Sequence, residues 1–534
     1  MIATLRRLSR SAVFLIGLTA FSAAFVVQSG ELGSSDTTHR LATTHSFWTS
    51  SPPVEASEYP DFGIHGRGGR IYAWYGIGQS LLMLPSDIIG TWVDDWRIFS
   101  AYQATDPTVR DIIVSYTTNI LVCVLAALAC FRLLGLFGFT VNEQVAGTLA
   151  LIFCTTFLHY TQNMMENNYI LLLTLTGLAF QYKWLRTGNT RALVIGAAAV
   201  GLNLLTRMTT VFDLLAVALF LLLVLHLEGI HGFEFRRRCL AYLKIALPVY
   251  AFFGLLDRLY QFYRFGSFFT NYIQLMGAEQ RRLNPAWPAS YPFETPFHVG
   301  FFGPFLSPAK SIFLFDPLLV LTIIVAAILW KKFRPEIRAY LLAFAVLLVG
   351  YICLYARFTD WTGNSAWGDR YVSTSAQILA FISVPLFLRH RADLPSAVRA
   401  LAATLAGVSA LVQAASVAFW CQLEIDQIDP LGHPVFLIGL RFRNIVAFAL
   451  RKATQWGLMS PDMTDDAWDY VHITTWNFLP FLLKRVGAAP SWVVDLLTAI
   501  WFAALAALLG LLFLIFRRAR RNELLAPRSF HLRA

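Results

Sequence analysis

The sequence contains few charged residues. Asp, Glu, Lys and Arg make up 14% of the 534 residues, whereas soluble proteins carry roughly 25%. Hydrophobic residues make up 57%, and the mean hydropathy is +0.56. These values exclude a soluble globular protein of this length. Apolar runs long enough to cross a bilayer recur along the chain, so the sequence predicts an all-α, polytopic membrane protein.

The motifs that hold nucleotides and metals are also absent. The sequence contains no GxGxxG segment and no Walker lysine, so a bound nucleotide is not indicated. Its six cysteines form no CxxC pair and no Cys–His cluster, which indicates neither a zinc site nor a disulfide framework. His39, His45 and His65 have no recognised ligand spacing. We therefore expect no cofactor, and ligand spacing gives no support for a divalent metal.

The positive charge of the chain indicates membrane orientation and no nucleic-acid partner. The net charge is +11, but the basic residues gather in short connections between apolar runs. We expect about twelve transmembrane helices, at residues 11–27, 112–130, 145–158, 169–180, 192–205, 211–225, 239–256, 312–330, 340–355, 371–388, 400–419 and 496–516. If the N-terminus is inside, every short inner connection is basic, as the positive-inside rule expects. Both termini are then cytoplasmic.

The long loops then lie outside, at residues 30–110, 264–310, 358–370 and 420–495. The second is rich in proline and aromatic residues, so we expect it to be irregular and able to act as a flap. Amphipathic helices are expected at 78–93 and 435–456, docked on the membrane surface. Residues 1–390 form the expected catalytic region, and residues 391–534 form a C-terminal membrane region.

A few charges fall inside apolar runs, where each costs roughly 2.5–3.5 kcal/mol. They are Arg207, Asp213, Asp257, Arg258 and Asp316, all toward the expected outer ends. The run before Arg207 is too short to cross the bilayer, which places Arg207 below the outer surface. These charges indicate a polar cavity that opens outward. The alternative is that Asp213 pairs with Arg207, and Asp257 with Arg258, and that these pairs only reach toward the interface.

The first long polar stretch, residues 34–79, concentrates reactive side chains after the first apolar run. If its beginning is helical, Asp36, His39 and Arg40 share one face by their i, i+3, i+4 spacing. Asp36 there can act as a general base toward a hydroxyl group. The alternatives are a solvated loop, or Asp36 as the cap of a helix that starts at Thr37.

Two further outer segments carry candidate residues. In GRGGRIYAWYGIGQ, a glycine turn presents Arg67 and Arg70, and Tyr72 and Tyr75 follow. An aromatic belt at the membrane interface is the competing interpretation of Trp74 and Tyr75. In TTFLHYTQNMMENN, Glu166 lies in a turn between two expected helices, where an acidic residue is more often a helix N-terminal charge than a catalyst.

The loop ARFTDWTGNSAWGDRYV completes the expected site. Trp361, Trp367 and Arg370 lie at the outer mouth of the helix that we expect to begin at Tyr371. Arg370 is suited to phosphate, because a guanidinium group binds phosphate in a bidentate manner.

Taken in order, these segments resemble the GT-C class of membrane glycosyltransferases, near its protein mannosyltransferase and aminoarabinose transferase branch. The matching elements are an early outer-loop aspartate, GRIYAWYGIGQSLLMLP, TTFLHYTQNMME, LLTRMTT, RFG, SPAKSIFLFDPLL and WTGNSAWGDRY. They cover most of residues 10–390. The resemblance implies a polyprenyl-phosphate sugar as donor, with transfer on the extracytoplasmic face of a membrane, which we expect to be the bacterial inner membrane.

The resemblance also assigns residues. Asp36 corresponds to the first-loop carboxylate and Glu166 to a second acidic position, so these two are the expected catalytic residues. The expected substrate contacts are His39, Arg40, Arg67, Arg70, Tyr72, Tyr75, Arg207, Arg258, Trp361, Trp367 and Arg370. Trp74 stands where many relatives have a phosphate-binding lysine, and Arg40, Arg67, Arg70 or Arg207 can take its place. Asp369 and Asp316 are two further departures.

The sequence therefore predicts a glycosyltransferase that moves a sugar from a polyprenyl phosphate to an acceptor hydroxyl, with an aspartate as general base. The acceptor can be a lipid, a glycan or a protein. One alternative is a transporter or flippase of lipid-linked saccharides, which needs polar groups nearer the membrane midplane and often has inverted repeats. A polymerase or ligase of lipid-linked saccharides is another.

Overall fold

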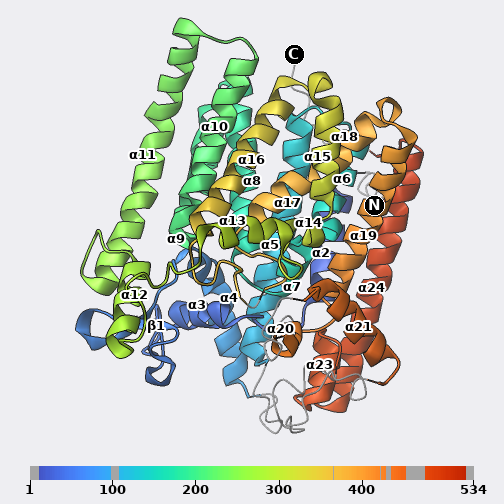
Figure 1. Ribbon diagram of the computed structural model, residues 1–534. Helices are drawn as coiled ribbons and strands as arrows, with labels where there is room; N and C mark the ends of the chain where they lie inside the picture. The colour runs from blue at the N-terminus through green and yellow to red at the C-terminus, as the bar shows by residue number, and fades with distance from the viewer. Residues whose placement is uncertain are drawn as a thin grey trace.

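The computed structural model describes residues 11–97, 107–364, 366–420, 423–428, 435–452 and 475–524. Long helices run roughly side by side, and shorter helices and loops gather at one end (Figure 1). The α-helices are α2 (Ala12–Val27), α3 (Ser35–His45), α4 (Gly78–Asp95), α5 (Val109–Leu136), α6 (Val141–Cys154), α7 (Phe157–Gln162), α8 (Asn167–Thr187), α9 (Thr190–Thr206), α10 (Val211–Leu227), α11 (Gly232–Phe265), α12 (Tyr272–Leu283), α13 (Phe297–Leu306), α14 (Ile312–Phe315), α15 (Leu318–Leu329), α16 (Pro335–Tyr355), α17 (Ser373–Phe381), α18 (Ser383–Arg389), α19 (Ser396–Ser416), α20 (Leu423–Ile428), α21 (Leu437–Ala449), α23 (Leu479–Val486) and α24 (Ser491–Arg520).

Short elements complete the described chain. The 3-10 helices are η1 (Ala56–Glu58), η2 (Arg67–Gly69), η3 (Met208–Thr210), η4 (Trp330–Lys332) and η5 (Arg391–Asp393). Two strands, β1 (Gly63–His65) and β2 (Ile71–Ala73), pair antiparallel with Ile64 opposite Tyr72. The expectation of an all-α protein therefore holds except for this hairpin.

Within the described residues, six helical segments are long and apolar enough to cross a membrane. They are Val109–Leu136, Met208–Leu227, Gly232–Phe265, Pro335–Tyr355, Ser396–Ser416 and Ser491–Arg520. Shorter apolar helices lie at Ala12–Val27, Val141–Cys154, Thr190–Thr206, Phe297–Leu306 and Ser373–Arg389. The chain is an integral, multi-pass membrane protein, and the expectation of about twelve spanning helices is met in part. The basic N-terminal residues lie outside the described part of the chain.

The expected helix 312–330 is broken. α14 ends at Phe315 and α15 begins at Leu318, because Pro317 has no backbone N–H and cannot continue the helix. The carboxylate of Asp316 accepts the backbone N–H of Thr156 at 2.7 Å and its hydroxyl at 3.0 Å. Asp316 therefore joins this break to the end of α6, which explains a charge inside an apolar run.

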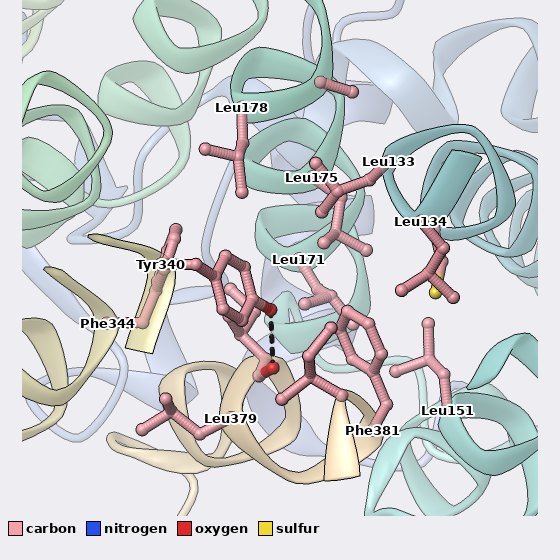
Figure 2. Close-up of a cluster of buried hydrophobic side chains, with 14 of the residues drawn as sticks. Leu133, Leu134, Leu151, Leu171, Leu175, Leu178, Tyr340, Phe344, Leu379 and Phe381 are labelled. Carbon is pink, nitrogen blue, oxygen red and sulfur yellow. Dashed lines mark hydrogen bonds between the residues drawn. The ribbon is translucent and has the colours of Figure 1, made fainter. Parts of the chain in front are cut away.

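The core forms where α5, α6, α8, α16 and α17 meet (Figure 2). Leucines of α8 point into this cluster, and the phenol of Tyr340 donates to the carbonyl oxygen of Ile378 at 2.6 Å. α8 packs against both α5 and α9. By contrast, only 11% of the most apolar window of α11, and of α24, is buried. These two helices stand at opposite edges of the bundle (Figure 1), where a membrane helix faces lipid.

Several expectations about the outer segments need correction. Residues 264–310 are not mainly irregular, because α12 and α13 form there and Asn271 caps α12 through the N–H of Gln274. The helix expected at 78–93 is present as α4 and packs on α5 and α3, and its docking on the membrane surface stays a prediction. α21 covers only Leu437–Ala449 of the amphipathic segment expected at 435–456, and residues 453–456 lie outside the described chain.

The division of the chain at residue 390 stays a prediction. Helices from the two parts contact each other, since α19 packs on α6 and α24 packs on α2.

Candidate functional site

A cavity of about 990 Å³, lined by charged and aromatic side chains, lies at the end of the bundle where the short helices gather. Its lining comes from α3, the segment after β2, the start of α8, η3, the end of α11, α12 and the loop after α16. These segments are distant in sequence but meet at one end of the molecule (Figure 1). Three of the charged residues that fall inside apolar runs, Arg207, Asp257 and Arg258, line this cavity. Asp213 does not pair with Arg207; its carboxylate accepts from Thr174 and Tyr351.

Asp36 is presented to the cavity by the way α3 begins. Ser34 caps the helix, since its hydroxyl accepts the N–H of Thr37, and the Asp36 carboxylate is left for other partners. One oxygen accepts the phenol of Tyr75 at 2.7 Å. The other accepts the guanidinium group of Arg370, also at 2.7 Å. Burial acts to raise the pKa of Asp36, but the charges of Arg370 and Arg40 outweigh it, so the pKa lies below its usual value of 3.8.

Glu166 joins two arginines of the cavity wall. It directly precedes α8, and its carboxylate pairs with Arg40 at 2.9 Å and also with Arg207. α9 ends at Thr206, which places Arg207 at the level of this cluster. Burial acts to raise the pKa of Glu166, but Arg207 and Arg40 hold it below its ordinary value. Because both oxygens are engaged, the contacts of Glu166 favour a role in organising the arginines.

The cluster is not electrically balanced. Three guanidinium groups (Arg40, Arg207 and Arg370) face two carboxylates (Asp36 and Glu166), which leaves one positive charge in excess. Among the described residues, the buried Nε atoms of Arg40 and Arg370 have no hydrogen-bond partner. Buried donors that lack partners are costly. An anion in the cavity can supply both the missing charge and the missing acceptors.

The buried ammonium group of Lys310 binds the backbone of the loop that carries Arg370. Lys310 donates from Nζ to the carbonyl oxygens of Asn364 (2.6 Å), Ala366 (2.9 Å) and Gly368 (3.2 Å). Gly368 has a φ of +77°, a conformation that L side chains rarely adopt. An ammonium group has three N–H donors, so these carbonyls match its capacity and fix the path of the loop.

Aromatic residues that the sequence did not single out form much of the remaining wall. Tyr355 and Tyr371 stack with ring centroids 4.2 Å apart, and Arg207 lies over Tyr371. Trp287 and Tyr291 also line the cavity and pack against each other, with ring centroids 4.4 Å apart. No periodicity connects these positions in sequence. Their enrichment in the outer loops was the available signal.

Six expected contacts lie outside the cavity lining. His39 stacks on Phe62 at 4.2 Å, and Tyr72 packs edge-on against Tyr263. Trp367 packs edge-on against Phe315, and the indole ring of Trp361 lies against Gly303. The last two, Arg67 and Arg70, are exposed on the hairpin.

Five of the eleven expected substrate contacts line the cavity together with Asp36 and Glu166. They are Arg40, Tyr75, Arg207, Arg258 and Arg370. Within the described ranges, no group of three or more His, Cys, Asp or Glu side chains is arranged to hold a metal ion.

No protein-family profile matches the sequence, and no curated protein sequence matches it significantly. Among solved structures, the chain is similar to ArnT from Cupriavidus metallidurans, crystallised with bound undecaprenyl phosphate. The match covers 88% of this chain and 84% of that chain, at 13% sequence identity and a TM-score of 0.39. Such a likeness assigns neither an activity nor a ligand to this chain.

Proposed function

We propose that this chain is a membrane glycosyltransferase that transfers a sugar from a polyprenyl-phosphate donor to an acceptor hydroxyl on the extracytoplasmic face. The observation that carries the proposal is the position of Asp36. This carboxylate pairs with Arg370 and belongs to a cluster of three arginines and two carboxylates, which carries one net positive charge at the end of a membrane helix bundle. A base next to an anion site is the pair of groups that displacement of a phosphate-linked sugar requires.

The reaction starts with removal of a proton from the acceptor. Asp36 takes the hydroxyl proton as the acceptor oxygen forms a bond to the anomeric carbon. The bond from that carbon to the phosphate oxygen breaks, and its electron pair leaves with the polyprenyl phosphate. The transition state has oxocarbenium character, as glycosyl transfer usually does. Arg40, Arg207 and Arg370 stabilise the negative charge that gathers on the leaving phosphate.

Arg370 links donor binding to the base. Without donor, its guanidinium group is paired with Asp36, which lowers the pKa of Asp36 and makes the carboxylate a weak base. A donor phosphate competes for the same guanidinium group. As Arg370 turns toward the phosphate, Asp36 loses part of its stabilising charge and becomes a stronger base. Proton removal is thereby favoured only when donor is present.

The proposal is tested by Asp36→Asn, which keeps the size of the side chain and removes the base. We expect transfer to fall about 10²–10⁴-fold. Mass spectrometry of co-purified lipids should find an intact polyprenyl-phosphate sugar on the variant and discharged polyprenyl phosphate on the wild type. Asp393→Asn is the control, because Asp393 is an exposed carboxylate paired with Lys332 away from the cavity.

Two results would contradict the proposal in different ways. Transfer by the Asp36 variant at the wild-type rate would remove Asp36 as the base. If neither form binds added polyprenyl-phosphate sugars, the proposed donor is lost, and the proposed transfer with it.

A further inference from the structure

The hairpin β1–η2–β2 carries two arginines that the cavity does not use. Arg67 and Arg70 are exposed, and no Asp or Glu of the described residues lies within ion-pair distance of either one. Burial raises the pKa of the Tyr72 phenol. The positive charges of Arg70 and Arg67 both oppose this rise. Both cations are carried by the same short hairpin, three positions apart in the sequence.

The hairpin is docked on the last turn of α11. Gly66 approaches the backbone carbonyl of Arg264 so closely that a side chain at this position would collide with it. Arg67 lies over the ring of Phe262 at 5.2 Å, and Phe262 stacks on Phe268 with centroids 4.4 Å apart. Tyr72 adds its edge-on contact with Tyr263. These contacts fix the height of the two arginines relative to the helix.

This end of α11 has the character of a membrane interface. Leu255 and Leu259 are exposed on the helix, and Tyr263 follows one turn later. Phe269, just after the helix, is 94% exposed. A large apolar ring is rarely this exposed to water, and aromatic residues concentrate where a membrane helix leaves the bilayer. Arg67, stacked on the last turn, is therefore at the height of the lipid headgroups.

From this placement we infer that the outer end of α11 and the hairpin form a binding site for an anionic phospholipid. Arg67 and Arg70 hold the headgroup phosphate, because guanidinium groups form charge-assisted hydrogen bonds to phosphate. The acyl chains lie along the exposed apolar face of α11 that carries Leu255 and Leu259. This site is independent of the transfer chemistry proposed for the cavity.

A membrane phospholipid fits these residues better than a free anion does. Two exposed cations in water hold a free phosphate weakly, since solvent and salt screen the attraction. A lipid brings its phosphate to the height of Arg67 and adds contact with the apolar face directly below. Each basic residue near an anionic membrane surface contributes binding, so the loss of two should weaken it about ten- to thirtyfold.

The test is native mass spectrometry of the purified full chain, titrated with dioleoyl phosphatidylglycerol or dioleoyl phosphatidylcholine. The two lipids share their acyl chains and differ in net charge. The wild type should retain the anionic lipid at lower concentration than the zwitterionic one. The double variant Arg67→Gln/Arg70→Gln should lose this preference, with about ten- to thirtyfold weaker binding of phosphatidylglycerol. Arg67→Lys/Arg70→Lys should keep most of it, because the charge remains.

Arg357→Gln is the matched control, since Arg357 is an exposed arginine that donates to the carbonyl oxygen of Phe293 and is not part of the hairpin. It should bind both lipids as the wild type does. The inference is overturned if the wild type retains both lipids equally, or if the double glutamine variant keeps the preference. Displacement of the bound lipid by an equal concentration of inorganic phosphate would identify a site for free anions and would also overturn it.

Discussion

Two buried ion networks lie on the cavity side of this protein, and they differ in charge balance. In the first, Arg441 pairs with Glu424, and its remaining N–H groups donate to the carbonyl oxygens of Ala415, Ser416, Phe419 and Trp420. One cation meets one anion, and both side chains are fully buried. In the second network, that of Asp36 and Glu166, cations are in excess beside a cavity.

The difference suggests different roles for the two networks. A buried pair whose donors are all used can bind nothing further, and removal of one partner leaves an unpaired buried charge. The network of the cavity keeps a positive charge and unused donors, which an anionic substrate can satisfy. The comparison leads us to propose a stabilising role for Arg441 and a ligand-binding role for Arg370.

Among variants that test the difference between the two networks, the largest expected effect is that of Arg370→Gln. It removes one cation from the donor phosphate, and loss of one such stabilising group typically lowers turnover about 10²–10³-fold. Arg441→Gln should instead lower the free energy of unfolding by about 3–5 kcal/mol and leave the rate per folded molecule unchanged. Transfer assays normalised to the folded fraction, together with thermal unfolding, measure both. Equal losses of rate per folded molecule would show that the two networks do not differ in function.

Lys310→Met tests whether the contacts of Lys310 with the loop before Arg370 are needed to position Arg370. The variant leaves the carbonyl oxygens of Asn364, Ala366 and Gly368 without their donor, so the loop should shift and misplace Arg370. We expect the KM for the donor to rise about tenfold, about 1.4 kcal/mol, with a smaller change in kcat. Lys332→Met, at an exposed lysine paired with Asp393, is the control and should change neither. A fall in kcat alone would argue against a positioning role.

Arg207→Lys has a smaller expected effect. It keeps the positive charge but loses the planar fork that can bind Glu166 and a phosphate together. Donor affinity should fall about tenfold, about 1.4 kcal/mol, while the protein remains folded. Titration of the variant with donor lipid measures this change. An unchanged affinity would mean that the positive charge alone is sufficient at this position.

The smallest expected effect is a dependence of stability on pH through Glu166. Arg207 and Arg40 hold its pKa below the ordinary 4.5, so the ionised carboxylate stabilises the folded state above that pH. This contribution is lost as the pH falls through the lowered pKa. The Tm difference between wild type and Glu166→Gln should stay constant from pH 8 to about 5 and become smaller below pH 4.5. Thermal unfolding across this range measures it, and a difference that grows on acidification would contradict the assignment.

The sequence predicted which residues line the cavity better than it predicted the contacts between them. The length of the run before Arg207 indicated a residue below the outer surface, and Arg207 does line the cavity. The spacing of Asp36 and Arg40 indicated a shared helical face, and both residues line the cavity from α3. His39 was expected on the same helical face, but it stacks on Phe62 and does not line the cavity, because residues at i+3 and i+4 point in different directions around the helix.

The sequence by itself determined the class of this protein, its apolar helices and the concentration of acid and base in its first polar stretch. These follow from local composition and period, which any window of the chain contains. Only the tertiary structure decided that Arg370 reaches Asp36, that Glu166 pairs with Arg40 and Arg207, and that Arg67 and Arg70 stay outside. Pairing between residues as many as 334 positions apart depends on how the helices pack. No local pattern of charge or hydrophobicity encodes that packing.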